Sequence, residues 1–370
     1  MKTNFKKMLV VLLCMAVIAS VVGCGSSTPA PSATTKATET TKPVSTTETT
    51  KPSSTPEFTM KFGHSNEPTP DAWFQVYALK FEELIESYSN GRIAVDIYPS
   101  SQLGDEMEMF RSVSLGTLES MVGAATNFVT FAPSLGYFTL PYMFESTTQS
   151  RAVIKEMLPW MQERSIEEAH ARVLGVADAG FRVLSTKEPV RSLADIKPMK
   201  IRVPQNAIMI GAYKSWDVGT VPLGWSETYT ALQQNLVDGQ DNPYNAILAA
   251  RLYEVQKYIT DIDFLMQANF FIVSDKFYTS LPEDLQAVVD KVGLELMDFA
   301  NKMTDEGIES DKKKLQENGM ELLGKPTDMD QWISKARSIW PEFYKTIGAG
   351  DAAKGEEIVK MVEAAKAKVK

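Results

Sequence analysis

Strand-like and helix-like patterns of apolar residues follow one another after about residue 58. Apolar and polar side chains alternate over residues 58–63 and again over residues 92–98, which predicts two strands. Between them, apolar side chains recur at helical spacing over residues 70–88, and the repeat stops at Asn90 and Gly91. A strand, a helix and a strand in this order predict a parallel βαβ unit.

Two loops follow these predicted strands, at residues 63–66 and 99–104. Because parallel sheets bind ligands at the carboxyl ends of their strands, a binding site is expected beside these loops. Ser65 and Asn66 can donate hydrogen bonds to a ligand there. His64 lies in the first loop, and we interpret it as a structural donor rather than an acid-base catalyst.

The same apolar spacing and turn residues predict further elements along the chain. A helix beginning after Asp105 and a helix with Ser226 as its N-cap are both favoured by residues that stabilise helix starts. The predicted helices cover residues 105–115, 148–169, 206–216 and the region from 282 onward, with a solvated amphipathic helix at 352–370. Further strands are predicted at residues 173–177 and 269–273.

The N-terminal residues have the composition of an export signal. Two lysine clusters precede an apolar run over residues 8–23, which is too short for a stable membrane-spanning helix. Residues 21–24 look like a bacterial lipobox, so residues 1–24 are predicted to be a lipoprotein signal peptide with the lipid on Cys24. The alternatives are a signal peptide cleaved elsewhere and an uncleaved anchor.

A tether is predicted next, because residues 25–57 are nearly all Ser, Thr, Pro, Ala and Lys and cannot form a core. A lipid at one end and a folded part at the other place the protein on the outer face of a cytoplasmic membrane. A Gram-positive-type surface suits a long tether better than a periplasm does. Residues 58–370 are long enough for two domains of ordinary size.

Charge and cysteine content narrow the function classes. The formal net charge of −9 argues against nucleic-acid binding, which needs a basic surface. Cys14 and Cys24 are the only cysteines, so the exported part has no disulfide and no thiolate metal site. No cofactor is predicted. An acidic protein that binds an anion must do so through a local positive site.

Two arginines offer such a site. Arg182 and Arg202 each lie in a short strand-like segment, and the turn-rich residues between the segments predict that these return side by side. A guanidinium at a strand end can grip a carboxylate through two parallel hydrogen bonds. The alternative is that both arginines form ordinary surface ion pairs with neighbouring acids.

Three sequence motifs contain or follow Arg202, at residues 201–204, 225–233 and 237–243. In this order and spacing they resemble the solute-binding proteins of tripartite ATP-independent periplasmic (TRAP) transporters, the DctP family, with a likeness that covers about residues 58–285. The resemblance implies an α/β fold like that of periplasmic binding proteins, with two lobes, hinge strands and a long helix that braces both lobes.

The implied division assigns two segments to each lobe. Lobe I comprises residues 58–179 plus 268–307, and lobe II comprises residues 180–267 plus 308–370. Extended segments that join two lobes act as hinges. Ligand binding in a cleft between the lobes is therefore expected to go with their closure.

The resemblance also implies the ligand-binding residues. Arg202 is expected to form a bidentate salt bridge with a ligand carboxylate, and Arg182 is expected to add a second contact. Trp225 is expected to stack on the carbon skeleton, although an ordinary core position is its alternative. Asn242 suits a hydroxyl or a second carboxylate oxygen, and Asn127 could reach the ligand from lobe I.

The resemblance therefore implies an extracytoplasmic receptor that binds a small organic acid and delivers it to small and large TRAP membrane subunits. C4-dicarboxylates, sugar acids such as uronates, and 2-oxo or hydroxy acids all carry the carboxylate, so the acid stays open. Sialic acid is disfavoured, because the family's sialic-acid binders carry an acid near Met121. The alternatives are a receptor of an ATP-driven importer or of a sensory system, with a hydrolase ranked below both.

An enzyme is not predicted. No cysteine is available as a nucleophile, and residues 224–228 begin like a serine-hydrolase elbow but lack its final glycine. No Gly-rich phosphate loop, HExxH motif or EF-hand loop occurs. Asp261 and Asp263 are close in sequence, but such acid pairs are common and seldom catalytic.

Overall fold

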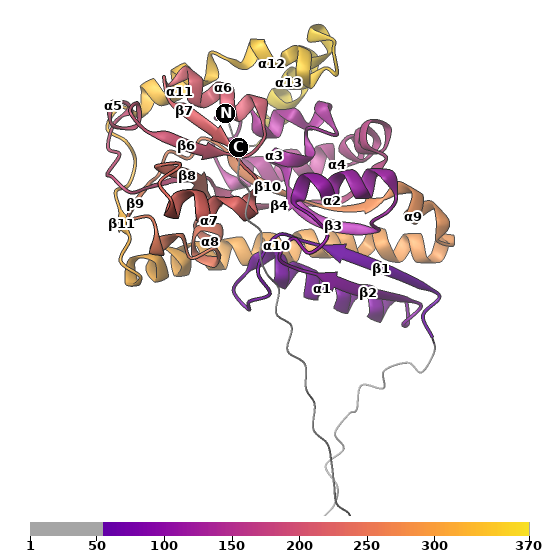
Figure 1. The fold of residues 1–370 in the computed structure, drawn as a ribbon. Helices are drawn as coiled ribbons and strands as arrows, with labels where there is room; N and C mark the ends of the chain where they lie inside the picture. The colour runs from indigo at the N-terminus through magenta and orange to yellow at the C-terminus, as the bar shows by residue number, and fades with distance from the viewer. Residues whose placement is uncertain (1–54, 370) are drawn as a thin grey trace, which may run out of the picture. The chain divides into compact units, whose positions relative to one another are not determined.

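The computed structural model describes residues 55–369 and shows an α/β fold with two sheets (Figure 1). The predicted signal peptide, Cys24 and most of the predicted tether lie outside the described residues. None of the helices in residues 55–369 combines the length and the hydropathy that a membrane span requires. The core consists of three apolar clusters that lie against the two sheets.

The first sheet contains the predicted βαβ unit. Its strand order is β2-β1-β3-β10-β4, with β1 parallel to β2 and β3, and with β10 antiparallel to β3 and β4. The strands are β1 (Phe58–Gly63), β2 (Ile93–Tyr98), β3 (Ser120–Ala124), β4 (Ala171–Phe181) and β10 (Met266–Ser274). Helix α1 (Trp73–Tyr88) connects β1 to β2, as the apolar spacing predicts.

The second sheet has the strand order β11-β9-β5-β8-β6-β7. Its strands are β5 (Val183–Thr186), β6 (Lys200–Val203), β7 (Gly219–Pro222), β8 (Gly239–Asn242), β9 (Tyr258–Thr260) and β11 (Glu321–Leu322). The prediction that the segments of Arg182 and Arg202 lie side by side is wrong, because β8 lies between β5 and β6. Leu184 pairs with Asp241 on one side of β8, and Arg202 pairs with Gln240 on the other.

Strand β8 escapes prediction because its sequence is Gly-Gln-Asp-Asn, which reads as a turn. All four residues are buried, and the three polar side chains each have a hydrogen-bond partner. Gln240 donates to Ser185, and Asp241 accepts from Tyr213 and Arg182. A polar strand can therefore lie in the centre of a sheet when each of its side chains has a partner.

Helix starts follow local rules that the sequence shows only in part. At α2 (Glu106–Leu115), the Asp105 side chain accepts from the Glu108 amide, and the Glu108 side chain accepts from the Asp105 amide, so the predicted start is confirmed. Ser226 is not an N-cap. Helix α7 (Trp225–Gln233) begins one residue earlier, and the Glu227 carboxylate accepts from the Gly224 amide at 3.0 Å.

The long brace predicted for both lobes is α10 (Glu283–Glu317), which runs along both groups of strands in Figure 1. It packs against β4 and α1 on one side and against α8 on the other. At the crossing with β4, an added Cβ on Gly175 would lie 2.7 Å from the carbonyl oxygen of Gly293. Glycine is therefore required at this crossing, because any side chain would push the helix away from the sheet.

The remaining helices complete the layers around the sheets. They are α3 (Ala125–Phe128), α4 (Thr147–Ala169), α5 (Leu193–Ile196), α6 (Ala207–Ser215), α8 (Tyr244–Ala249), α9 (Asp275–Ser280), α11 (Met329–Arg337), α12 (Trp340–Ile347) and α13 (Ala352–Lys366), with 3-10 turns η1 (Pro133–Thr139) and η2 (Leu252–Glu254).

The C-terminal helices depart from the predicted picture. Helices α12 and α13 pack against η1 and α4, which the predicted division places in the other lobe. Helix α13 has a buried apolar face with Ile358, Val359 and Val362, as an amphipathic helix does. Trp340 also donates from Nε1 to the carbonyl oxygen of Pro141 at 3.0 Å. The exact lobe boundaries stay a prediction.

Candidate functional site

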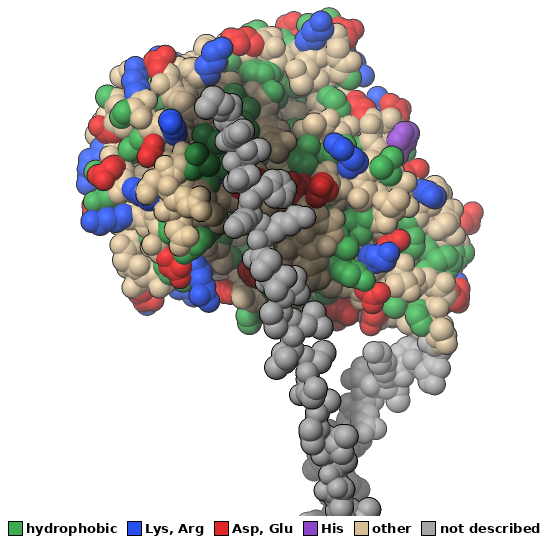
Figure 2. Space-filling view, viewed as in Figure 1, with side chains coloured by type: hydrophobic (Ala, Val, Ile, Leu, Met, Phe, Trp, Pro, Cys, Tyr) green, Lys and Arg blue, Asp and Glu red, His purple; other side chains and the backbone are tan. Residues whose placement is uncertain are grey.

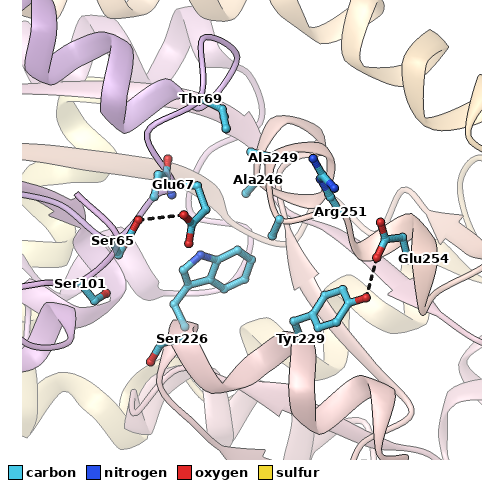
Figure 3. Close-up of a pocket in the computed structure, with 14 residues that line it drawn as sticks. Ser65, Glu67, Thr69, Ser101, Ser226, Tyr229, Ala246, Ala249, Arg251 and Glu254 are labelled. Atoms are coloured by element: carbon cyan, nitrogen blue, oxygen red, sulfur yellow. Dashed lines mark hydrogen bonds between the residues drawn. The ribbon is translucent and has the colours of Figure 1, made fainter. Parts of the chain in front are cut away.

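A cavity of about 540 Å³ lies where the loops after β1 and β2 face α7 and α8 (Figure 3). The loops of the first sheet supply mainly polar side chains, and the segments around the second sheet supply Trp225, the small side chains of α8 and further polar residues. The lining consists of Ser65, Asn66, Glu67, Thr69, Ser100, Ser101, Trp225, Ser226, Tyr229, Ala246, Ala249, Ala250, Arg251 and Glu254. We call this space the outer cavity.

Two smaller cavities adjoin Trp225 from other directions. One, of about 60 Å³, is lined by Asn66, Trp73, Phe74, Ala124, Ala179, Trp225, Asn242, Pro243, Asn245, Ala246, Ala249, Gln267 and Asn269. The other, of about 10 Å³, is lined by Asp105, Glu106, Met107, Asn127, Arg202, Gln205, Leu223, Gly224 and Trp225. We call them the hinge-side cavity and the Arg202 cavity. Trp225 lines all three spaces, so it lies at the centre of the cleft.

Arg202 is a buried cation without an ion pair. Its side chain extends from β6, only 4% of the residue is exposed, and its Nε and Nη2 both donate to the carbonyl oxygen of Leu223, at 3.1 and 2.7 Å. Within residues 55–369 no salt bridge includes Arg202, whereas the equally buried Arg182 has one. Because Leu223 occupies the Nε edge, the edge formed by Nη1 and Nη2 remains available for a carboxylate.

The electrostatics of Arg202 reflect this isolation. Burial, followed by the nearby Arg182 guanidinium, lowers the pKa of Arg202 to about 10, while Asp241, Glu106 and Glu227 act in the opposite direction. The guanidinium therefore stays charged at neutral pH. A buried charge of this kind is costly until an opposite charge approaches, and an anionic ligand supplies that charge.

The ring of Trp225 lies near this cation, with its centroid 5.6 Å from the Arg202 Cζ. Trp225 is half-buried and also packs against the apolar cluster that contains Ala231 and Leu232. The predicted ligand contact and the alternative of a core position are therefore both compatible with its surroundings, since one face packs inward and another lines the cleft.

Arg182 has different surroundings from those predicted. Its Nε donates to the Asp241 carboxylate at 2.5 Å, its Nη2 donates to the Asp241 carbonyl oxygen, and its Nη1 donates to Gln267 at 2.6 Å. It does not line any of the three cavities. These contacts favour a supporting role, in which Arg182 holds Gln267 in the wall of the hinge-side cavity, and its predicted contact with a ligand stays a prediction.

The amide side chains of the cleft divide into two groups. Asn66 and Asn242 both line the hinge-side cavity. The side-chain Oδ1 of Asn66 accepts from the backbone N–H of Phe74 at the start of α1. The side-chain Nδ2 of Asn242 donates to Oε1 of Gln240 at 2.6 Å. Each of them therefore keeps one end of its amide for a ligand. Asn127 lines the Arg202 cavity, but its amide donates to Glu106 at 2.8 Å.

Glu106 is the main site residue that the sequence interpretation missed. It is 7% exposed and accepts hydrogen bonds from Ser65, Asn127 and the Ala124 amide. The predicted residues Ser65 and Asn127 therefore meet at this carboxylate. Glu106 lies at the first position of an amphipathic helix, where an acid is expected for helix stability alone. Its role in the site depends on donors that are distant in the sequence, so no local pattern indicates it. Gln267 and Asn269, on β10, were missed because their strand reads as core.

His64 is fully buried beside the outer cavity and bonds through Nε2 to Gln75 at 3.0 Å. Burial lowers the pKa of His64 to about 4, so the ring is neutral at physiological pH. Its Nδ1 has no partner in the described part of the chain. These contacts agree with the interpretation of His64 as a structural residue.

Residues 55–369 contain no group of three or more His, Cys, Asp or Glu side chains that could hold a metal ion. Lys and Arg side chains are interspersed with Asp and Glu on the face shown in Figure 2, without a large basic patch. Arg202 itself is buried, so its charge faces the interior of the cleft and not that surface.

Comparison with known proteins gives a consistent result. A sequence model of the bacterial extracellular solute-binding proteins, family 7, matches residues 62–346. The C4-dicarboxylate-binding periplasmic protein of Rhodobacter capsulatus is 28% identical over 315 residues, which cover 83% of this chain and 91% of that protein.

Two solved structures of TRAP periplasmic solute-binding proteins are similar to this chain. One, from Rhodobacter sphaeroides in an open form without ligand, has 34% identity and a TM-score of 0.70, and the match covers 83% of this chain and 99% of that one. The other, from Roseobacter denitrificans with bound L-galactonate, has 25% identity and a TM-score of 0.74, with 84% and 99% covered.

Proposed function

This chain belongs to family 7 of the bacterial extracellular solute-binding proteins, which includes the TRAP solute receptors, and on that premise we propose that it binds a small organic acid through Arg202. The family consists of extracytoplasmic receptors and not of enzymes. The single observation that carries the proposal is a buried guanidinium, in a cleft between two sheets, that has no carboxylate partner among residues 55–369.

The ligand carboxylate is proposed to lie against the Nη1 and Nη2 edge of Arg202. Each charge-assisted hydrogen bond contributes about 1.5–3 kcal/mol, and contact with the Trp225 ring adds an apolar term. After the cost of association, these terms are sufficient for about micromolar affinity. Asn66 and Asn242 are proposed to bind the part of the ligand that extends past Trp225.

Ligand entry is proposed to require movement of the lobes. The Arg202 cavity has a volume of about 10 Å³, which is about the space of one water molecule and too small for a carboxylic acid. Strands β4 and β10 carry the connections between the two sheets, at Phe181 and Met266, and extended connections of this kind act as hinges. A ligand that binds between the lobes then favours the closed state.

The class of acid is supported by the relatives. The Rhodobacter capsulatus protein is named for C4-dicarboxylates, and the Roseobacter denitrificans protein holds L-galactonate, a sugar acid. C4-dicarboxylates and L-galactonate both carry a carboxylate that a guanidinium can bind. We therefore propose a C4-dicarboxylate or a sugar acid as the ligand of this chain.

Delivery and anchoring complete the proposal. The closed receptor is proposed to dock on the small and large TRAP membrane subunits, and Cys24 is proposed to carry a lipid that holds the protein on a Gram-positive-type surface. Mass spectrometry of the protein from its native membrane tests the anchor directly. A diacylglycerol-modified N-terminal Cys24 is expected, and an unmodified N-terminus at another residue would contradict it.

A thermal-shift screen with an organic-acid library tests the binding proposal. An acid that binds only the folded protein raises its apparent stability, so at least one acid should raise the melting temperature of the wild-type protein. Arg202→Ala should lose that response, while Arg111→Ala, which removes an exposed arginine on α2, should keep it. An unchanged response in Arg202→Ala would remove Arg202 from the site.

A further inference from the structure

Glu106 is the acidic counterpart of Arg202 in the cleft. Both side chains line the Arg202 cavity, Glu106 from the first turn of α2 and Arg202 from β6. Both are buried, and within residues 55–369 neither takes part in a salt bridge. The chain therefore keeps a buried anion and a buried cation in one cavity without joining them.

The contacts of Glu106 leave one accepting position open. Its Oε1 accepts from the Ser65 hydroxyl at 2.6 Å, and its Oε2 accepts from the Ala124 amide at 3.0 Å and from the Asn127 amide at 2.8 Å. Each carboxylate oxygen can accept about two hydrogen bonds, so Oε2 is saturated and Oε1 is not. The three donors hold the carboxylate in a fixed position that a ligand hydroxyl can approach.

The surroundings of the cleft add further negative charge. In the outer cavity, Glu67 accepts from Ser100 at 2.9 Å and Glu254 accepts from Tyr229 at 2.6 Å, the latter pair being visible in Figure 3. Arg251 is the cationic side chain of that cavity. Hydroxyl groups meet hydrogen-bond acceptors in such surroundings, whereas a second ligand carboxylate meets like charges.

We infer that Glu106 selects the class of acid: it accepts a hydrogen bond from a ligand hydroxyl and repels a second ligand carboxylate. The inference rests on the proposed function, because it places the first carboxylate on Arg202. The preferred ligand is then a hydroxylated monocarboxylate, such as an aldonate or a uronate, and C4-dicarboxylates are disfavoured. The two classes left open above are thereby separated by one side chain.

Titration calorimetry with two sets of acids tests the inference. L-galactonate and D-gluconate represent hydroxylated monocarboxylates, and succinate and fumarate represent dicarboxylates. The wild-type protein should bind the tightest acid of the first set at least about 10-fold more tightly than the tightest acid of the second, because like charges in a poorly solvated cleft repel strongly. A preference for the dicarboxylates, or no binding of either set, would overturn the inference.

Glu106→Gln keeps the shape of the side chain and removes its charge. Its ratio of affinities for the two sets should fall by about 10-fold or more, because the charged acceptor is lost and the repulsion with it. Glu108→Gln is the matched control, since it lies on the same helix, is exposed, and can still cap the helix. It should leave the ratio unchanged.

An unchanged ratio in Glu106→Gln, with folding confirmed by circular dichroism, would overturn the role of Glu106. If this variant does not fold, the inference is tested by the wild-type protein alone, through its ratio of affinities for the two sets of acids. Arg202→Ala separates the two levels of the proposal: binding of every acid should be lost in it. Retained binding in Arg202→Ala would refute the proposed function, whereas lost binding with an unchanged Glu106→Gln ratio would refute only the inference about Glu106.

Discussion

Replacing Arg202 by methionine is expected to stabilise the protein without ligand. Burial lowers the pKa of Arg202 to about 10, which corresponds to a cost of about 3 kcal/mol for carrying the charge in the folded state. The cost of a lowered cation pKa is fully present below the folded pKa, hence at neutral pH, and it falls only as the pH rises above about 10 toward the unfolded pKa. Methionine removes the charge and retains much of the volume.

The gain is reduced by the contacts that Arg202 makes. Its Nε and Nη2 donate to the Leu223 carbonyl oxygen, and leaving this acceptor without a donor costs about 1–2 kcal/mol. The net effect of Arg202→Met is then a gain of about 1–2 kcal/mol in the free energy of unfolding at pH 7. For a protein of this size, this gain raises the melting temperature by roughly 2–3 °C.

Differential scanning calorimetry on ligand-free protein measures this effect. Arg111→Met is the matched control, because Arg111 is exposed on α2 and its replacement should change the melting temperature little. The protein must be refolded or dialysed extensively first, because retained ligand would stabilise the wild type alone. A melting temperature of Arg202→Met clearly below that of the wild type would show that Arg202 is a structural residue, and the reasoning would fail.

Three other perturbations give distinct readouts. The buried His64, whose pKa is lowered to about 4, should reduce the free energy of unfolding by about 2 kcal/mol between pH 7 and pH 5, because the unfolded chain binds the proton first. His64→Gln should remove this loss in urea titrations at the two pH values. Burial raises the pKa of Asp311 to about 6, so protonation of Asp311 opposes the loss of stability on acidification. Asp311→Asn should therefore be about 1–3 kcal/mol more stable than the wild type at pH 7 and lose more stability on acidification. Equal pH profiles of the two proteins would contradict this. Trp225→Ala should weaken acid binding by about 10-fold in calorimetry, and an unchanged affinity would leave Trp225 as a core residue only.

Local patterns predicted much of the first sheet. The βαβ unit over residues 58–98, the start of α2 at Asp105 and the strand at residues 269–273 all follow from apolar spacing and caps, and the structure contains each of them. These features depend on neighbours within a few residues. Sequence periodicity carries that information directly.

The second sheet shows where this reasoning ends. The sequence of strand β8 is typical of a turn, because its polar side chains find partners only after β5, β6 and α6 have assembled around it. The role of Glu106 could not be predicted for the same reason. Its three donors come from Ser65, Ala124 and Asn127, which lie in different parts of the chain. The isolation of Arg202 is also a tertiary property, because only the folded structure shows that no carboxylate of residues 55–369 forms a salt bridge with it.

The measurement that tests the central claim most directly is titration calorimetry of Arg202→Lys with the tightest acid of the screen. Lysine keeps the positive charge at this position but lacks the planar pair of donors that binds two carboxylate oxygens. If the carboxylate lies on the Nη1 and Nη2 edge of Arg202, the affinity should fall by about 100-fold or more while the protein stays folded. An affinity within about threefold of the wild-type value would contradict the bidentate contact, and with it the account of this cleft as a carboxylate site.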